Sequence, residues 1–231
     1  MTFRALIAEK TDSGYRTELR DLDESALKGE VLVDVAYSSL NYKDGLAVTA
    51  RGKIIRKFPM VLGIDLAGTV VESSSPDYKP GERVVACGQG LGETEWGGYA
   101  QRQRVRSEVL VPLPDALTFE QAMALGTAGF TAMLCALALE KMDVRPSERE
   151  FVVTGAAGGV GSVAVMLLAR RGYKVAASTG RPELEDYLRS LGATSIVPRD
   201  ELAKKSAPLE SERWGGGVDT VGGQTLSTLF A

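Results

Sequence analysis

The stretch of residues 151–161, F-V-V-T-G-A-A-G-G-V-G, constrains the fold more than any other part of the chain. Three apolar residues run into a glycine-rich turn, and beyond it apolar residues recur at helical spacing, at Val160, Val163, Ala164, Leu167 and Leu168. Read from Ala156, the turn is A-x-G-x-x-G, the dinucleotide-binding fingerprint with alanine in place of its first glycine. Gly158 lets the backbone approach a pyrophosphate, and Gly161 lets the helix pack closely on the strand. The stretch therefore predicts a strand, a turn and a helix whose N-terminus binds a dinucleotide.

The residues at the end of the next predicted strand indicate which dinucleotide is bound. That strand covers residues 173–178, and its end offers Ser178, Thr179, Gly180 and Arg181. An NAD site has Asp or Glu near here for the ribose 2′-hydroxyl. In this chain no carboxylate follows the start of this strand until Glu183. Two hydroxyls and a guanidinium suit a 2′-phosphate, which arginine binds with paired charge-assisted hydrogen bonds. The sequence predicts NADPH as the cofactor; the alternative is an ordinary strand-to-helix loop with a solvated arginine.

Histidine is absent from the chain, and the only cysteines are Cys87 and Cys135. A tetrahedral zinc site built from Cys and His is thereby excluded, so we predict no metal site and hydride chemistry that proceeds without zinc. The proton donors that remain are Tyr, Lys, Asp, Glu, Cys and water. The two cysteines are interpreted as core thiols in a reducing compartment rather than as a disulfide.

Charge and hydropathy exclude two classes of partner. The formal net charge is −3 and the only dense basic run spans residues 51–57, so no nucleic-acid partner is expected. The first ten residues lack a long apolar core, and no later segment reaches about 18 uninterrupted apolar residues. We therefore expect neither an export signal nor a membrane span, and predict a soluble, cytoplasmic protein.

The part of the chain before Pro114 reads as short strands separated by glycine and proline turns. Strands are expected at residues 3–8, 31–36, 67–71, 83–86 and 109–112, which predicts an irregular all-β barrel. After Pro114 a capping box that begins at Thr118 precedes an apolar helix, and a second helix is expected over residues 127–141.

From residue 151 onward strands and helices alternate. A helix is expected at residues 183–191 and strands at residues 195–197 and 218–221, which gives a βαβαβ pattern and a parallel doubly wound sheet. The predicted fold class is α/β, with one domain at residues 1–125 and a Rossmann domain at residues 126–231. A full Rossmann sheet continues for two further strands, so we expect this one to be truncated at its C-terminus, with the last strand at an edge.

Six segments together resemble one family. They are S-S-L-N-Y-K-D at residues 38–44, the run at 52–59, G-I-D-L-A-G-T-V at 63–70, W-G-G at 96–98, G-T-A-G-F-T-A-M-L at 126–134, and the run at 154–161. They are similar to the zinc-independent medium-chain dehydrogenase/reductases, and within these to the acrylyl-CoA reductases, often labelled quinone oxidoreductases. The resemblance covers essentially the whole chain. It implies a GroES-like catalytic domain joined to the Rossmann domain, NADPH as hydride donor, reduction of an activated carbon–carbon double bond, and a homodimer.

The resemblance also implies roles for particular residues. Tyr42 would lie beside the nicotinamide and Arg199 at the adenosine end, while the pyrophosphate would contact Ala157, Gly158, Gly159 and Val160. The 2′-phosphate would contact Thr179, Gly180 and Arg181, with Ser178 beside them. Arg199 has an alternative interpretation as a solvated loop arginine beside Asp200. Thr127 and Thr131 could hydrogen-bond near the nicotinamide, or simply cap and back-bond within a helix.

Conjugate reduction requires hydride delivery to the β-carbon, stabilisation of the enolate oxygen and a proton for the α-carbon. The candidate catalytic residues are Asn41, Tyr42 and Asp44, which share one loop after the strand at residues 31–36. We predict Tyr42 as nicotinamide neighbour and candidate proton donor, Asn41 as a residue that orients the substrate, and Asp44 as the anchor of the loop. The alternative is that Asn41 and Asp44 merely cap a helix. Asp65, in a glycine-rich strand turn, is assigned a structural role.

The basic run at residues 51–57 is a candidate for docking the phosphates of a CoA thioester, with a solvated basic loop as the alternative. The predicted function is NADPH-dependent reduction of acrylyl-CoA or a similar short enoyl thioester to its saturated product, propanoyl-CoA in the first case. Two alternatives stay open. One is reduction of quinones or 2-alkenals on the same scaffold, and the other is an NADPH-binding protein without catalysis.

Overall fold

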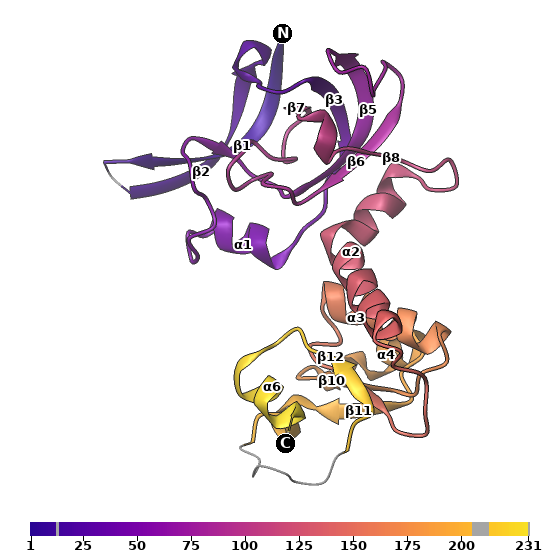
Figure 1. Cartoon of the computed structure of the whole chain (residues 1–231). Coiled ribbons are helices and arrows are strands. Elements are labelled where there is room, and N and C mark those ends of the chain that lie inside the picture. Colours follow the sequence, from indigo (N-terminus) through magenta and orange to yellow (C-terminus); the bar gives the residue numbers. More distant parts are fainter. Residues whose placement is uncertain (13, 205–212, 231) are drawn as a thin grey trace. The chain divides into compact units, whose positions relative to one another are not determined.

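The computed structural model describes residues 1–12, 14–204 and 213–230, and the chain divides into two compact units, Met1–Thr127 (unit 1) and Ala128–Ala231 (unit 2) (Figure 1). The elements of unit 1 are β1 (Thr2–Thr11), β2 (Gly14–Asp23), β3 (Val31–Tyr37), α1 (Tyr42–Val48), β4 (Met60–Val61), β5 (Asp65–Ser73), β6 (Arg83–Cys87), β7 (Arg102–Val105) and β8 (Val111–Pro112). Helix α2 (Phe119–Lys141) begins in unit 1 and ends in unit 2. The remaining elements are β9 (Phe151–Val153), α3 (Gly159–Arg170), β10 (Val175–Thr179), α4 (Glu185–Ser190), β11 (Ser195–Pro198), α5 (Arg199–Leu202), β12 (Gly216–Val218) and α6 (Gly223–Leu229).

Unit 1 is built from two antiparallel sheets, a five-stranded one with the order β7-β3-β5-β6-β8 and a three-stranded one with the order β2-β1-β4. A cluster that includes Val33, Leu66 and Val84 forms the core of the larger sheet. Phe3 of β1 and Leu32 of β3 belong to a second cluster, so strands of the two sheets pack against each other. The predicted strand-rich character of this region is confirmed, although unit 1 also contains helix α1.

Several strands of unit 1 differ from the sequence prediction. Strands β2, β4 and β7 were not predicted, and β2 shows why. It pairs with β1 along its whole length, yet none of its residues is buried and most are polar, so it lacks the alternation of buried apolar residues that marks a strand. The strand expected at residues 109–112 is too long, because residues Ser107–Val109 form a 3₁₀ turn and only Val111–Pro112 is extended.

Helix α2 begins at the predicted capping box. The Thr118 N–H donates to Gln121 Oε1 (3.0 Å), and the Gln121 N–H donates to Thr118 Oγ1 (3.1 Å). Gly126 then interrupts the helix with φ 47° and ψ −153°, a conformation that disfavours any residue with a Cβ. The two helices expected on either side of residue 126 are therefore two segments of α2.

The apolar character of α2 qualifies the expectation that nothing in the chain could span a membrane. By length and composition alone, α2 is the one helix in the described part of the chain that could do so, with a mean hydropathy of 1.8 over 18 residues. Its second segment places Ala132, Cys135 and Leu139 against the core of unit 2. A core helix passes the same test of length and composition, so the finding is weak support for a membrane span.

Unit 2 contains a four-stranded parallel sheet with the order β11-β10-β9-β12. The first four strands of a doubly wound sheet have this 3-2-1-4 order, so the predicted α/β class with a parallel doubly wound sheet is confirmed. Every residue of β9 and β10 is buried, as expected for parallel strands covered on both faces. Among the described residues, β12 has β9 as its single neighbour and lies at the edge of the sheet.

Two strands of unit 2 lie a few residues from their predicted positions. The last strand is Gly216–Val218 rather than residues 218–221, because the Asp219 carboxylate accepts the N–H of Val221 (3.3 Å) and of Gly222 (2.7 Å) and turns the chain. Strand β10 begins at Val175 rather than Tyr173. The Tyr173 ring instead packs on Phe151 at 4.5 Å, and its hydroxyl donates to the Val144 carbonyl (2.6 Å).

The predicted helix over residues 183–191 is also shorter than expected. A 3₁₀ turn at Pro182–Leu184 precedes α4, which covers Glu185–Ser190. Pro182 occupies the first position of this turn, where its missing N–H needs no partner.

Candidate functional site

Helix α1 begins in the S-S-L-N-Y-K-D segment and is held by a buried carboxylate. Asp44 is 1% exposed, and its oxygens accept the N–H of Asn41 (2.9 Å) and the N–H of Ile64 (3.0 Å). The bond to Asn41 closes the first turn of α1, while the bond to Ile64 fixes that turn to the segment before β5. The alternative interpretation, in which Asn41 and Asp44 cap a helix, therefore describes an interaction that the structure contains.

Asp65 joins three of the resembling segments in one network. It is fully buried, and its carboxylate accepts hydrogen bonds from the Ser39 hydroxyl, from Asn41 Nδ2 (3.2 Å), and from the N–H (2.8 Å) and hydroxyl (2.5 Å) of Thr127. All of these partners are donors, so a carboxylate, which only accepts, matches them. The structural role assigned to Asp65 is consistent with these bonds. Sequence reasoning missed Ser39, and it did not foresee that these segments meet.

Glycines allow this close approach. A Cβ on Gly126 would lie 2.7 Å from Asp65 Oδ2, and one on Gly98 would lie 2.0 Å from the Asp65 carbonyl oxygen. Thr127, directly after Gly126, opens the second segment of α2, and its N–H is among those that a helix leaves without an internal partner. The Asp65 carboxylate therefore caps this segment, and its negative charge lies at the favourable end of the helix dipole. Thr131 follows one turn later and is half-buried.

The groups around Asp65 are held in their neutral forms. Burial, together with the nearby Asp65 carboxylate, raises the pKa of the Cys87 thiol to about 12. Burial and Asp44 raise the pKa of the Tyr99 phenol well above its ordinary value, and the Tyr99 hydroxyl donates to the Ser39 carbonyl (2.9 Å). Neither Cys87 nor Tyr99 was singled out for this region from the sequence. Neither side chain ionises at neutral pH, so both contribute packing and hydrogen bonds around Asp65 rather than charge.

Tyr42 differs from its neighbours in the same loop. It is the first residue of α1, and 85% of it is exposed, whereas Asp44 two residues later is buried. Lys43 is turned toward Glu93, with Nζ 3.0 Å from its carboxylate. Asn41 Nδ2 is directed inward, at 2.7 Å from Ser39 Oγ. Among the ionisable residues of this loop, Tyr42 is therefore the most exposed to solvent.

The glycine-rich turn of unit 2 follows β9 as predicted. Gly155 has φ 57°, and a Cβ there would lie 2.3 Å from Thr220 Oγ1. A Cβ on Gly161 would lie 2.3 Å from the Gly155 carbonyl oxygen, so this glycine does allow the close helix packing that the fingerprint implies. Gly158 is the N-cap of α3, and the N–H groups of Gly159 and Val160 belong to the first turn, which leaves them without helical acceptors.

A side-chain network not foreseen from the sequence ties this turn to the end of β12. The Thr154 hydroxyl donates to Asp219 Oδ1 (2.5 Å) and accepts the Thr220 N–H (3.0 Å), while the Thr220 hydroxyl donates to the Thr154 carbonyl (2.9 Å). Strands β9 and β12 are the first and fourth strands of the unit, so the network lies at the carboxyl ends of the strands where the sheet order reverses. Doubly wound sheets bind their ligands in this crevice. The one sequence signal for this network was the position of Asp219, which follows directly after the strand at its end.

The residues predicted for a 2′-phosphate gather at the end of β10. Ser178 and Thr179 are buried, and Thr179 Oγ1 accepts the Arg181 N–H (3.1 Å). Arg181 reaches the glycine turn, with Nη2 donating to the Ala157 carbonyl (2.6 Å). Arg199 packs over Gly180, since a Cβ on that glycine would lie 3.3 Å from Arg199 Nε. The structure thus brings the two arginines, Gly180 and Ala157 to one end of the sheet.

No group of His, Cys, Asp and Glu that could hold a metal occurs in the described part of the chain.

A parallel sheet with a glycine turn and two arginines at its carboxyl edge, preceded by a strand-rich unit, indicates a dinucleotide-dependent oxidoreductase. The family model of the alcohol dehydrogenase GroES-like domain matches residues 27–115. The Acrylyl-CoA reductase AcuI of Ruegeria pomeroyi is 54% identical over 99% of this chain and 70% of its own length. The Putative quinone oxidoreductase YhfP of Bacillus subtilis is 44% identical over the same shares of the two chains.

Solved structures agree with these relatives. The yhdH oxidoreductase of Salmonella enterica in complex with NADP superposes with a TM-score of 0.94 at 52% identity, covering 99% of this chain and 70% of that one. The chain belongs to the medium-chain dehydrogenase/reductase family, in the branch of the acrylyl-CoA reductases. The resemblance inferred from the six segments is confirmed.

Proposed function

We propose that the chain is an NADPH-dependent reductase of an activated carbon–carbon double bond, with acrylyl-CoA as substrate and propanoyl-CoA as product. The observation that carries this proposal is the 54% identity to Acrylyl-CoA reductase AcuI over 99% of the chain. The position of Arg181 between the end of β10 and the glycine turn supports the choice of NADPH, as does the relative solved in complex with NADP.

The residues of unit 2 fit NADPH. Gly155 and Gly161 occupy positions that a Cβ would obstruct, and the N–H groups at the start of α3 suit a pyrophosphate, with contacts proposed for Ala157, Gly158, Gly159 and Val160. Arg181 would exchange its bond to the Ala157 carbonyl for the 2′-phosphate, beside Ser178, Thr179 and Gly180. Arg199 would contact the adenosine end. When bound, NADPH supplies the hydride for the β-carbon.

The loop of unit 1 supplies the other requirements of the reaction. Tyr42 is exposed and ionisable, so we assign it to the nicotinamide side of the site and to proton delivery to the α-carbon. Asn41, whose amide nitrogen contacts Ser39, orients the thioester. Asp44 and Asp65 act by positioning, because their oxygens already accept buried hydrogen bonds. Thr127 and Thr131 are assigned to hydrogen bonds near the nicotinamide.

The finer points of the assignment are proposals of the same kind. Residues 1–125 form the catalytic domain and residues 126–231 the NADPH domain of a zinc-independent, cytoplasmic enzyme.

A homodimer is supported by α2, where Phe130, Leu134 and Leu137 form an apolar stripe about half exposed to solvent. Light scattering of the native protein, with Leu134→Ser as the variant that weakens association, tests the dimer. A monomer at micromolar concentration rejects it.

One alternative function has an observation behind it, since YhfP carries the name of a quinone oxidoreductase. Quinones and 2-alkenals present the same hydride-accepting carbon without CoA. The experiment is NADPH oxidation with acrylyl-CoA, a quinone and a 2-alkenal, each with and without excess chelator. Preference for acrylyl-CoA with no effect of chelator supports the proposal. Turnover of the quinone alone supports the alternative, and NADPH binding without any turnover indicates a non-catalytic binding protein.

Tyr42→Phe tests the proton-transfer role within the same assay. Removing a general acid lowers kcat by about 10²- to 10⁴-fold, whereas the affinity for NADPH should change little. Tyr37→Phe is a matched control, because Tyr37 is another partly exposed tyrosine, at the end of β3. A variant at Tyr42 with the kcat of the wild type removes this residue from proton transfer.

A further inference from the structure

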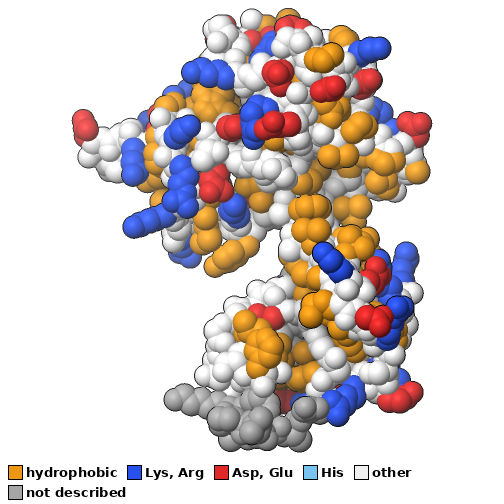
Figure 2. Space-filling model, viewed as in Figure 1, with side chains coloured by type: hydrophobic (Ala, Val, Ile, Leu, Met, Phe, Trp, Pro, Cys, Tyr) orange, Lys and Arg blue, Asp and Glu red, His pale blue; other side chains and the backbone are white. Residues whose placement is uncertain are grey.

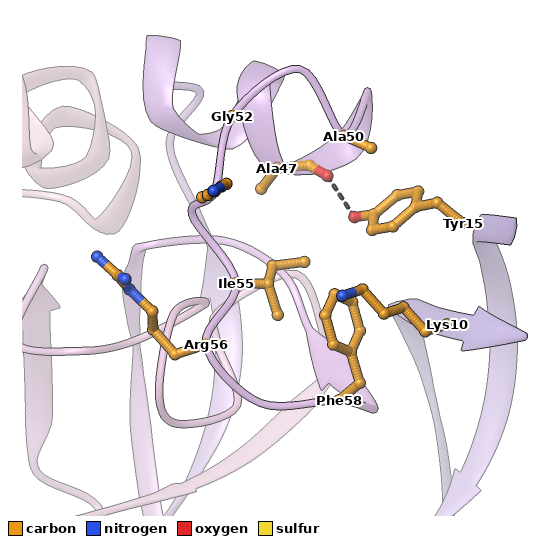
Figure 3. A pocket seen from close by; sticks show the side chains of 9 residues that line it. Lys10, Tyr15, Ala47, Ala50, Gly52, Ile55, Arg56 and Phe58 are labelled. Atoms are coloured by element: carbon orange, nitrogen blue, oxygen red, sulfur yellow. Dashed lines mark hydrogen bonds between the residues drawn. The ribbon is translucent and has the colours of Figure 1, made fainter.

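A pocket of about 390 Å³ lies within unit 1, beside the segments described above but separate from the Asp65 network (Figure 3). It is open to solvent on one side and bounded by the end of the β1–β2 hairpin, the C-terminal end of α1 and the basic segment that follows. The residues that determine its chemistry are Lys10, Tyr15, Lys53, Ile55, Arg56 and Phe58. Its size falls in the range of small-ligand sites.

The walls of the pocket combine aromatic rings with an aliphatic side chain. Tyr15 and Phe58 meet edge to face, with ring centroids 6.0 Å apart and an interplanar angle of 84°. The Tyr15 hydroxyl donates to the Ala47 carbonyl, which holds this ring against the end of α1. Figure 3 shows Ile55 between the two rings and Arg56, all around one space. Such walls suit a flat, partly apolar group such as a purine.

The rim of the pocket is cationic. Lys10 Nζ lies 5.1 Å from the centroid of the Phe58 ring, and neither Lys10 nor Lys53 forms an ion pair with another residue in the described ranges. Arg56 Nε is 3.7 Å from Glu93, a carboxylate that Lys43 also contacts at 3.0 Å. One carboxylate therefore offsets two cations and leaves the others unbalanced. Figure 2 shows Lys and Arg side chains gathered over β1, β2 and α1, although the whole chain carries a net charge of −3.

The place of the pocket relates it to the candidate catalytic loop. Ala47 and Ala50 line it at the C-terminal end of α1, whereas Asn41 and Tyr42 lie at the N-terminal end of the same helix. Helix α1 is seven residues long, so its two ends, and with them the loop and the pocket, lie about 10 Å apart. A CoA thioester has a phosphorylated adenosine at one end and its acyl group at the other, joined by a flexible arm longer than this. The C-terminal end of a helix repels anions, so phosphates here need the lysines and the arginine.

We propose that this pocket binds the 3′-phosphorylated ADP end of the CoA thioester, with the adenine against Tyr15 and Phe58 and the phosphates on Lys10, Lys53 and Arg56. The inference rests on the proposed function for the identity of the ligand, while the site itself rests on the pocket and its charges. It also divides the basic run at residues 51–57. Lys53 and Arg56 line the pocket, whereas Arg51 and Lys57 do not.

The first experiment measures binding of CoA itself to the full chain by calorimetric titration. Lys10→Ala and Lys53→Ala should each raise the Kd for CoA about three- to tenfold, and the double variant more, with the effect fading at high salt. Arg51→Ala and Lys57→Ala remove the same charge from the same segment outside the pocket, and should change the Kd less than about twofold. Equal weakening by pocket and control variants would show a diffuse electrostatic effect and overturn the site.

The second experiment separates the pocket from the proposed function. The KM for acrylyl-CoA should rise in the double variant, while the KM for acrylyl-pantetheine, which lacks the nucleotide, and the Kd for NADPH should stay unchanged. An unchanged KM for acrylyl-CoA in an active enzyme rejects the pocket and leaves the proposed function intact. Binding of CoA that depends on Lys10 and Lys53, in a protein that reduces no enoyl thioester, rejects the function and retains the pocket. If the variants weaken NADPH instead, the cations serve the cofactor and the proposal is wrong.

Discussion

The two units hold their candidate sites by different physical means. In unit 1 buried carboxylates do so, since Asp44 and Asp65 accept hydrogen bonds from segments that are 20 or more residues away, up to the 62 residues between Asp65 and Thr127. In unit 2 the turn after β9 is shaped by missing side chains, because Gly155 and Gly161 lie where a Cβ would collide with backbone or a hydroxyl. Unit 1 thus depends on charge brought together by folding, and unit 2 on a contiguous run of small residues.

This difference predicts different sensitivities. A buried carboxylate surrounded by donors is costly to lose, because the donors remain buried without an acceptor. A glycine at a close approach is sensitive to size instead of charge, because any Cβ forces strands and helix apart. The site of unit 1 should therefore fail when charge is removed, and that of unit 2 when volume is added.

The largest effect is expected for Asp65→Ala. Removing the carboxylate leaves Ser39, Asn41 and Thr127 without their acceptor, which should lower the free energy of unfolding by about 3–5 kcal/mol and abolish reductase activity. Chemical denaturation measures it. Asp34→Ala on β3 is the control, because Asp34 is exposed and its pair with Arg102 should contribute less than about 1 kcal/mol. Equal losses in the two variants would contradict the role given to Asp65.

Gly161→Ala should come next and should act on the other unit. Its Cβ would lie 2.3 Å from the Gly155 carbonyl oxygen, so we expect a loss of about 2–4 kcal/mol and weaker NADPH binding. Gly45→Ala is the matched control in α1, where a Cβ meets nothing within 4 Å. Alanine should stabilise that helix slightly. Thermal unfolding and NADPH titration of both variants test this prediction. If Gly161→Ala keeps the stability and the NADPH affinity of the wild type, the close packing does not constrain this turn.

Arg181→Ala should affect cofactor choice more than stability. Charge-assisted hydrogen bonds contribute about 1.5–3 kcal/mol, so the Kd for NADPH should rise about tenfold to a hundredfold, while the Kd for NADH should stay within about twofold. Calorimetric titration of both cofactors against both proteins tests this. NADH is an informative comparison because the structure of the relative yhfP has NAD bound. Equal weakening of the two cofactors would mean that Arg181, through Ala157, supports the turn rather than the 2′-phosphate.

The smallest effect on stability near neutral pH is expected from Cys87, and it grows as the pH rises. The pKa of its thiol is 9.0 in the unfolded chain and about 12 in the folded one, so folding favours the protonated form. This contribution is fully present below pH 9 and is lost as the pH rises from 9 to 12. At pH 9, alkylation of Cys87 should be slower in the native protein than in urea by two orders of magnitude or more, as mass spectrometry can measure. Comparable rates would contradict a partly buried thiol held in its neutral form.

Contiguous patterns were sufficient to predict unit 2. The alternation of apolar strands and helices predicts the sheet order, and the close approach of Gly161 to Gly155 lies within the run from Thr154 to Gly161. The bonds that Thr154 makes with Asp219 and Thr220 come from far along the chain, and the run did not predict them. The boundaries of β10 and β12 were wrong by two or three residues. There Tyr173 and Asp219 make bonds to Val144 and Gly222 that end or displace a strand, and such bonds leave little trace in local propensity.

In unit 1 the sequence by itself determined the candidate loop of Asn41, Tyr42 and Asp44 and the β-rich character of the unit. Only the tertiary structure decided that Asp44 and Asp65 are committed to holding the loop, that Tyr42 is exposed, and that Lys10 lies beside Lys53 and Phe58. The strands of this unit pair over long separations, and its edge strand β2 buries none of its residues. A local pattern specifies which residues share a helix or a turn. Which distant segments meet is decided by packing and by the matching of buried donors to buried acceptors.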